Sequence, residues 1–203
     1  MVLWKSIVLG VVQGLTEFLP VSSSGHLVVV SQLLKAGTSV AYDVALHAGS
    51  LIALLIFFWR DVVGLFQGFL ATFRASSPPA VVRKRNVFWI LVLAILPSGI
   101  AGFLLSDTID KAFTSVTLVG AMFLVTGLLL FLQHFSATTR TVREVTWKDA
   151  LAIGIGQTFA LLPGLSRSGT TMSVGVYRGI RQEDAAHFSF LMAIPTIAGA
   201  ALA

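Results

Sequence analysis

Long apolar runs separated by short polar segments dominate this sequence. Three of these runs come close to the roughly 20 residues that a helix needs to cross a bilayer, and they predict membrane spans at about 40–59, 87–105 and 116–132. A fourth predicted span begins at about 188 and continues to 203. The pattern therefore predicts an all-α, polytopic membrane protein.

Four further apolar runs are too short to span a bilayer, and they form two pairs that are each divided by a proline. A proline ring disrupts a helix interior, so each pair predicts a helix, a break and a second helix. The predicted halves are 2–19 with 23–36, and 147–162 with 166–180. Such a hairpin is allowed in a membrane where its unwound tip is buried in protein or faces water. We therefore expect re-entrant helix hairpins at 2–36 and 147–180.

The first break gathers polar side chains in an apolar setting. Gln13 and Glu17 are four residues apart and share one face of a helix. The residues after the proline include Ser22, Ser23, Ser24 and His26. Serines suit the start of a helix, where backbone N–H groups are free. An ionisable group at membrane depth is a functional-site candidate by default, so this break is the first candidate site.

The second break repeats this design. A constant offset of 144 residues pairs polar positions of the two breaks: Gln13 with Gln157, Ser22 with Ser166, and Ser24 with Ser168. Because the matches cluster around two proline-broken helices, they predict an inverted-topology repeat, with a first copy at 1–136 and a truncated second copy at 137–203. The copies differ in chemistry, since the first carries Glu17 and His26 and the second carries Arg167.

Composition and charge support the membrane interpretation. Only 11% of the residues are charged, against about 25% in soluble domains. The net charge of +5 raises the alternative of a nucleic-acid partner, but the positive residues lie between the predicted spans, as the positive-inside rule describes. We therefore expect contact with the lipid bilayer and none with nucleic acid. The absence of cysteine excludes disulfide chemistry, and Gln13 and Glu17 argue against a signal peptide in the first apolar run.

Two motifs and the segment after the first resemble a known family. Gln13-x-x-x-Glu17 fits an (E/Q)xxxE motif, residues 163–171 fit a PGxSRSxxT motif, and residues 17–26 fit the linking segment. From residue 1 to 203, the chain resembles the undecaprenyl-diphosphate phosphatases, also called bacitracin-resistance proteins. Members of that family are longer, so we expect either a fragment or a shortened homologue in which the second repeat is incomplete.

The resemblance implies a cellular location, an enzymatic activity and a cofactor. It implies a multi-pass protein of the bacterial plasma membrane, with two inverted repeats and an active site that opens to the outer face. Such an enzyme hydrolyses a polyprenyl diphosphate lipid, undecaprenyl diphosphate, to undecaprenyl phosphate and inorganic phosphate, which recycles the lipid carrier of cell-wall synthesis. The resemblance also implies a divalent cation, Mg²⁺ or Ca²⁺, as cofactor. For the oligomeric state, we also consider a homodimer.

The chemistry of a diphosphate suggests a role for each candidate residue. Arg167 offers a planar, permanently charged fork that suits phosphate oxygens, and Glu17 would ligate the metal or act as a base. Ser23 is the candidate nucleophile through a phospho-enzyme, and His26 is its rival, because it exchanges a proton near neutral pH. The expected substrate-binding residues are Gln13, Ser22, Ser24, Ser166, Ser168 and Thr171.

Two other functions use the same features. A polyprenyl-phosphate transporter or flippase is the main alternative, because transporters also build midplane sites from broken helices in inverted repeats. A phosphatidic-acid-type phosphatase is suggested by Ser24-Gly25-His26, but that family needs a second histidine a few residues after its Ser-Arg pair. The next histidine after Arg167 is His187, which is too distant in sequence.

Overall fold

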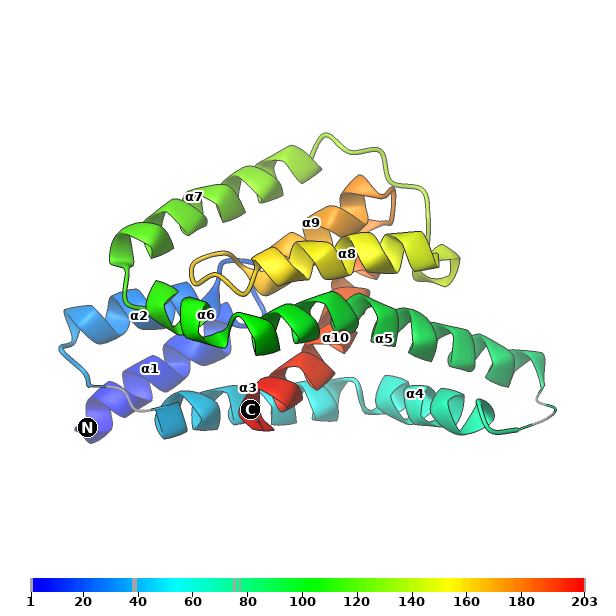
Figure 1. Ribbon diagram of the computed structural model, residues 1–203, viewed down its shortest axis with the longest axis horizontal. Coiled ribbons are helices and arrows are strands. Elements are labelled where there is room, and N and C mark those ends of the chain that lie inside the picture. Colours follow the sequence, from blue (N-terminus) through cyan, green and yellow to red (C-terminus); the bar gives the residue numbers. More distant parts are fainter. Residues whose placement is uncertain (1, 38–39, 75, 77, 203) are drawn as a thin grey trace.

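The computed structural model describes residues 2–37, 40–74, 76 and 78–202. Within these residues the chain forms ten α-helices and one 3-10 helix, and it forms no β-strand (Figure 1). The helices are α1 (Leu3–Thr16), α2 (Ser23–Leu33), α3 (Val40–Phe57), α4 (Trp59–Ala71), α5 (Pro79–Leu104), α6 (Ser106–Ala112), α7 (Val116–Gln133), η1 (Val142–Glu144), α8 (Trp147–Phe159), α9 (Arg167–Tyr177) and α10 (Gln182–Leu202). The predicted all-α class is confirmed.

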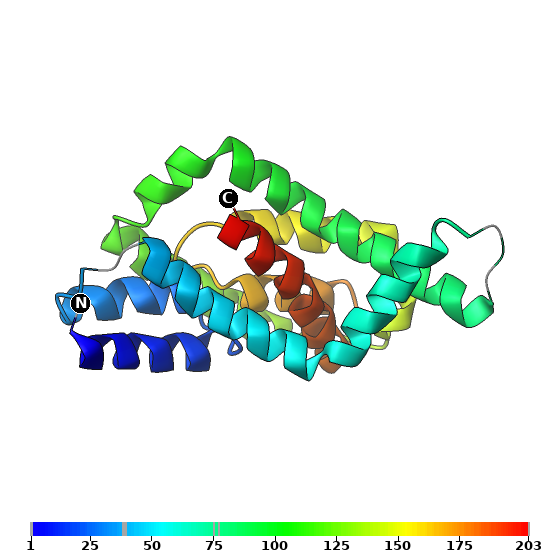
Figure 2. The same ribbon diagram turned by 90° about the horizontal axis from the view of Figure 1, so that it is seen from below.

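Two helices, α5 and α7, are long and apolar enough to cross a membrane. Helices α3 and α4 would add a third span if they are counted together, although they meet at a bend of 82°. Figure 2 shows this corner between the two helices. These lengths are compatible with a multi-pass membrane protein, and the bounds of α7 agree closely with the predicted span at 116–132.

Helices also occupy the polar segments between the predicted spans. Helix α4 occupies part of the segment at 60–86, and α5 begins at Pro79 and not near 87. Proline is favoured in the first turn of a helix, because its missing N–H would have no partner there. Pro79 therefore begins α5, although a proline in a helix interior would indicate a break. The segment at 106–115, between two predicted spans, contains the short helix α6.

The two proline-broken segments fold as two pairs of neighbouring helices. Helix α1 packs on α2, and α8 packs on α9. The pairs open toward opposite ends of the molecule, and the turns that join their helices lie close together near its middle (Figure 1). We call these the first turn (17–22) and the second turn (160–166).

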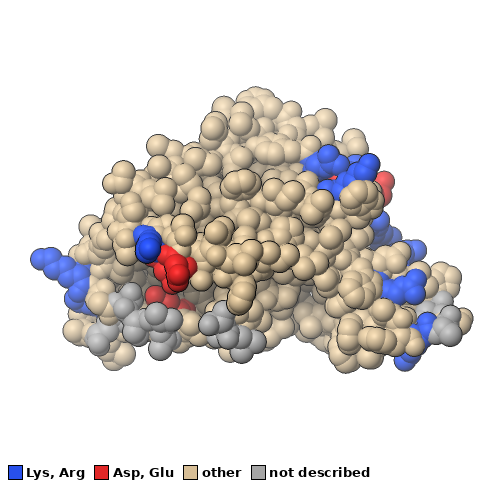
Figure 3. Space-filling model, in the orientation of Figure 1, with Lys and Arg blue, Asp and Glu red and all other residues tan. Residues whose placement is uncertain are grey.

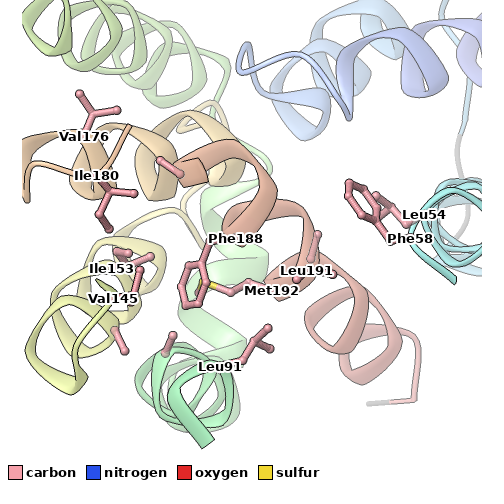
Figure 4. Close-up of a cluster of buried hydrophobic side chains, with 14 of the residues drawn as sticks. Leu54, Phe58, Leu91, Val145, Ile153, Val176, Ile180, Phe188, Leu191 and Met192 are labelled. Carbon is pink, nitrogen blue, oxygen red and sulfur yellow. The ribbon is translucent and has the colours of Figure 1, made fainter. Parts of the chain in front are cut away.

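Helix α10 passes through the centre of the assembly and carries much of the core (Figures 2 and 4). Phe188, Leu191 and Met192 are each at most 3% exposed. Helix α8 packs closely on α5, because a Cβ atom at Gly154 would lie 2.3 Å from the carbonyl oxygen of Ala94. Small residues at such crossings let helix backbones approach each other. The core therefore fixes the α8–α9 pair, and with it the second turn.

Lysine and arginine side chains gather at one end of the molecule, at the right of Figure 3, which we call the basic end. There Asp149 of α8 is fully buried and accepts hydrogen bonds from Arg140 at 2.6 Å and Arg178 at 2.8 Å. Burial alone raises the pKa of Asp149, but hydrogen bonds from Arg140, Thr146 and Arg178 outweigh burial and hold that pKa well below its usual range. Asp149 thus ties the segment before α8 to the end of α9.

Candidate functional site

The two turns meet in a buried ion pair. Arg167, the first residue of α9, donates from Nη2 to Oε1 of Glu17, the residue that follows α1, over 2.5 Å. Glu17 is 7% exposed and the Arg167 side chain 21%. The partners are 150 residues apart in the sequence. The structure therefore brings together the two charged residues that the sequence places on separate hairpins.

The second carboxylate oxygen of Glu17 accepts two further hydrogen bonds. Gln13 donates to Oε2 over 2.9 Å, and the hydroxyl of Ser23 donates to the same oxygen in a short hydrogen bond. Gln13 also donates to Ser50 of α3 over 3.4 Å. A hydroxyl in contact with a carboxylate can pass its proton to that group while its oxygen attacks an electrophile. The Ser23 hydroxyl, at the start of α2, thus lies directly beside the Glu17 carboxylate of the first turn.

Ser22 and Ser24 shape the start of α2. Ser22 has a φ of 67°, in a region that residues other than glycine rarely adopt, and it is 4% exposed. Its hydroxyl accepts a hydrogen bond from the Gly25 N–H over 3.3 Å and lies 3.4 Å from the Ser24 hydroxyl. This capping orients the first turn of α2, and the backbone N–H groups at a helix start suit an anion such as phosphate.

His26 lies on α2 but does not contact the carboxylate. Its Nδ1 is 2.8 Å from the carbonyl oxygen of Ser22, which assigns the ring proton to Nδ1 and leaves a lone pair on Nε2 in the neutral ring. The ring packs edge-on against Phe123 of α7, with centroids 5.0 Å apart. Within the described residues, no hydrogen bond joins His26 to Glu17 or Ser23. The geometry therefore pairs Ser23, and not His26, with Glu17.

Thr126 of α7 holds the second turn in place. Its hydroxyl donates to the carbonyl oxygen of Gly164 over 3.1 Å and accepts from the Ser166 N–H over 3.0 Å. Gly164 has a φ of +91°, and a Cβ atom there would lie 2.4 Å from the Val119 carbonyl oxygen, so a larger residue would clash with α7. The backbone directly before Arg167 is thus fixed by a neighbouring helix.

The remaining hydroxyls of the second turn bond to the protein. Ser166 caps α9 by accepting from Gly169 over 3.0 Å, and Ser168 donates to the Leu19 carbonyl oxygen over 3.4 Å. The Thr171 hydroxyl lies 2.9 Å from the Arg167 carbonyl oxygen and 2.6 Å from the Ser189 hydroxyl of α10. The sequence assigns Ser166, Ser168 and Thr171 to substrate binding; in this structure their hydroxyls hold α9 and its neighbours together.

The contacts of the two hairpins match each other. In both, a serine side chain caps the second helix by accepting from a glycine N–H three residues on. In both, a buried glutamine donates to a hydroxyl of another helix: Gln13 to Ser50 over 3.4 Å, and Gln157 to Ser98 over 2.6 Å and to Thr196 over 3.4 Å. Each glutamine is 1% exposed and leaves its Oε1 without a partner. Residues that the offset of 144 pairs in the sequence therefore also make similar hydrogen bonds.

Three residues that support the site were not predicted: Ser50, Thr126 and Ser189. Each is a buried polar residue within a largely apolar helix, between 4% and 5% exposed. Isolated serines and threonines in apolar helices often bond across to a neighbouring helix, so their positions were a usable signal. Their partners depend on how the helices pack, which the sequence pattern does not contain.

A divalent cation would find few protein ligands at the two turns. Among the residues that the structure describes, no group of three or more His, Cys, Asp or Glu could hold a metal. Glu17 offers a carboxylate, and the buried Oε1 of Gln13 offers a free acceptor. Proteins often bind Mg²⁺ through one or two carboxylates together with substrate phosphates. The donor set therefore fits a cation whose coordination is completed by phosphate oxygens.

Comparison with known proteins identifies the family. The family model described as Bacitracin resistance protein BacA matches residues 6–203. The chain belongs to this family. An undecaprenyl-diphosphatase of Methanosphaera stadtmanae is 40% identical over 207 residues, which cover 98% of this chain and 75% of the relative. The protein of the same name from Desulforudis audaxviator is 40% identical over 201 residues, with 98% and 74% covered. The family suggested by the two motifs is confirmed.

Proposed function

We propose that this chain hydrolyses undecaprenyl diphosphate to undecaprenyl phosphate and inorganic phosphate, and so recycles the lipid carrier of cell-wall synthesis. Membership of the family and the names of the relatives support this activity. The structural observation that carries it is the contact of the Ser23 hydroxyl with Glu17, which is itself paired with Arg167. In the proposal Ser23 acts as nucleophile, Glu17 as base and Arg167 as cationic phosphate ligand, which are the groups that phosphoryl transfer requires.

In the proposed reaction the terminal phosphate lies between Arg167 and the start of α2. Ser23 Oγ attacks the terminal phosphorus while Glu17 takes the hydroxyl proton. The Oγ–P bond forms as the bond from that phosphorus to the bridging oxygen breaks, and undecaprenyl phosphate leaves. Water then attacks the phosphoserine, which releases inorganic phosphate and restores the Ser23 hydroxyl.

Arg167 and the backbone stabilise the charge on the transferred group. The guanidinium is always positive and presents several N–H donors in one plane, and only Nη2 is engaged by the protein among the described residues. The N–H groups at the starts of α2 and α9 add neutral donors. A divalent cation, held by Glu17 and Gln13, would supply further positive charge at the phosphate oxygens when bound. His26, with its lone pair on Nε2, is the alternative nucleophile.

The proposed membrane arrangement follows the two pairs of helices. The pairs 2–36 and 147–180 would be re-entrant hairpins of an inverted repeat, with copies at 1–136 and 137–203, in the plasma membrane. The matching capping and glutamine contacts of the two hairpins support a repeat. The positive-inside rule assigns the basic end to the cytoplasm. The α1–α2 pair opens away from that end (Figure 1), so the site would open to the outer face.

Release of phosphate from undecaprenyl diphosphate by the purified chain in detergent tests the proposal. We expect release by the unaltered chain and a fall in kcat of about 100-fold or more for Ser23→Ala and for Arg167→Lys, because one removes the nucleophile and the other the planar fork. Ser31→Ala is the matched control, since Ser31 lies on the same helix and its hydroxyl donates only to the Val28 carbonyl oxygen, over 3.0 Å.

The outcomes separate the alternatives. Folded protein that binds the lipid without releasing phosphate would contradict the phosphatase and favour the transporter, which no present observation favours. Near-normal turnover by Ser23→Ala would transfer the role of nucleophile to His26. A loss in Ser31→Ala as large as in Ser23→Ala would show that the effect comes from damage to α2 and not from chemistry.

A further inference from the structure

A cleft of about 490 Å³ lies at the basic end, where α4, α5, η1 and α10 meet. Its lining includes neither Glu17 nor Arg167 and no residue of the two turns. The proposed reaction therefore gives this cleft no role. The charged and titratable side chains that line it are Arg60, Asp61, Arg83, Lys84, Arg143 and His187.

The lining of the cleft is strongly cationic. The lining contains four cationic side chains and one carboxylate, that of Asp61, which gives a formal charge of +3 when His187 is counted as neutral. Asp61 is itself shared, because its Oδ2 lies 3.5 Å from Nε2 of His187. Lys84 donates to Gln67 over 2.6 Å, a neutral partner that leaves its charge uncompensated. Positive charge in a cleft of low dielectric attracts anions more strongly than the same charge on an open surface.

The arginines of the cleft have no carboxylate partners within the described residues. Arg83 and Arg143 form no ion pair there, and Arg60 only stacks on the Trp59 ring, 5.5 Å from its centroid. Other carboxylates of the basic end are already engaged: Asp149 with Arg140 and Arg178, Asp184 with Arg181, and Glu144 with Thr141. Arg60, Arg83 and Arg143 are exposed, so their charges are available to an external anion that enters the cleft.

The rest of the lining is apolar. Leu65 of α4, Ile90 of α5 and Leu191 of α10 line the same cleft as the arginines. Helix α4 turns by 82° away from α3 and exposes Phe66 and Phe69, as expected for a helix that lies at a membrane interface. A cationic rim beside an apolar wall suits a ligand with an anionic head and a hydrocarbon chain.

We propose that this cleft binds the phosphate headgroup of an anionic phospholipid, with Arg60, Arg83 and Arg143 around the phosphate and an acyl chain along the apolar wall. The positive-inside rule alone explains basic residues in this region, but it does not explain why three arginines without carboxylate partners converge on one partly apolar cleft. Basic pockets between helices at the cytoplasmic side are a known form of lipid headgroup site. The proposal does not depend on the proposed phosphatase activity.

Native mass spectrometry of the full chain in neutral detergent, titrated with phosphatidylglycerol, tests the proposal. Each basic residue near an anionic headgroup changes affinity by about fivefold, so we expect Arg83→Gln with Arg143→Gln to weaken the first binding step by roughly 25-fold. Arg74→Gln is the control, because Arg74 lies between α4 and α5, is exposed, and does not line the cleft. It should change the affinity less than twofold. An equal loss in the control would overturn the site.

A variant with the opposite effect guards against misfolding as the cause. Asp61→Asn removes the carboxylate of the cleft, so it should tighten phosphatidylglycerol binding by about fivefold, which damage to the fold would not do. Unchanged or weaker binding in this variant would contradict the proposal.

Two further probes distinguish a lipid from a soluble anion. Phosphatidylcholine, whose headgroup is neutral overall, should bind at least tenfold more weakly than phosphatidylglycerol. Soluble glycerol phosphate should compete only at much higher concentration, because it lacks the chain that would contact the apolar wall. Equal binding of the two lipids, or competition by glycerol phosphate at the same concentration as the lipid, would refute an anionic-lipid site.

Discussion

Replacing Thr126 by valine tests whether the second turn is held by one hydroxyl. Thr126 is 4% exposed, and its hydroxyl serves two backbone groups, the Gly164 carbonyl oxygen at 3.1 Å and the Ser166 N–H at 3.0 Å. Valine has nearly the shape of threonine but no hydroxyl, so the variant leaves both backbone groups unpaired. These groups lie directly before Arg167, which the proposed reaction uses to hold phosphate.

The size of the effect follows from the number of lost partners. Leaving one buried polar group unpaired costs about 1–3 kcal/mol, so two groups cost about 2–6 kcal/mol. Even the lower figure lowers the population ratio of the ordered turn to a loosened turn by roughly 30-fold. We expect kcat/KM for undecaprenyl diphosphate to fall by at least about tenfold, and the Ser166 amide to exchange its hydrogen faster.

Phosphate release and hydrogen exchange are measured together on the Thr126→Val and Thr126→Ser variants. Serine keeps the hydroxyl and loses only a methyl group, so it should retain most of the activity and the protection of the Ser166 amide. Equal activity and equal amide protection in the two variants would refute the reasoning, because they would show that the hydroxyl does not order the turn.

Two further predictions concern stability and are checked by thermal unfolding in detergent. Asp149→Asn should lower the free energy of unfolding by about 2–3 kcal/mol, less than for a fully buried pair because Arg140 and Arg178 are 29% and 45% exposed. The pKa of Asp149 is lowered in the folded state, so its contribution to the free energy of unfolding is present above the ordinary pKa of 3.8 and is lost as pH falls below that value. The Asp149→Asn variant should therefore lose less stability on acidification than the unaltered chain. Gly154→Ala should cost about 1–3 kcal/mol, because the added Cβ would lie 2.3 Å from the Ala94 carbonyl oxygen. In contrast, Gly127→Ala, with no atom within 4 Å of the added Cβ, should be neutral or stabilising.

Much of the fold could be predicted from the spacing of apolar runs and prolines. The span at 116–132 and the halves of both hairpins lie within a few residues of α7, α1, α2, α8 and α9. These elements were accessible because a proline break and the length of an apolar run are local features of the sequence. The meeting of Glu17 with Arg167 is not local, but the repeat offset of the two breaks and their complementary charges anticipated it.

Other parts of the structure depend on packing that no local pattern encodes. The start of α5 at Pro79 places Arg83 and Lys84 inside a helix, where the sequence pattern indicated a loop. Thr126 could be recognised as a polar residue in an apolar span, but its bond to the backbone of the second turn requires the position of α7. The same limit applies to Ser189, whose contact with Thr171 requires the position of α10.

The ion pair between the two turns has a consequence for how the proposed reaction begins. In the free site, Glu17 is neutralised by Arg167 and also accepts from Gln13 and Ser23. An arriving diphosphate competes with Glu17 for the Arg167 guanidinium, because phosphate oxygens can accept from two of its N–H donors, whereas Glu17 accepts from Nη2 alone. As Arg167 shifts toward the phosphate, the Glu17 carboxylate loses part of its compensating charge and accepts the Ser23 proton more readily. Substrate binding would then prepare the base at the moment when the nucleophile must be activated, and without substrate the pair would keep the buried charges balanced.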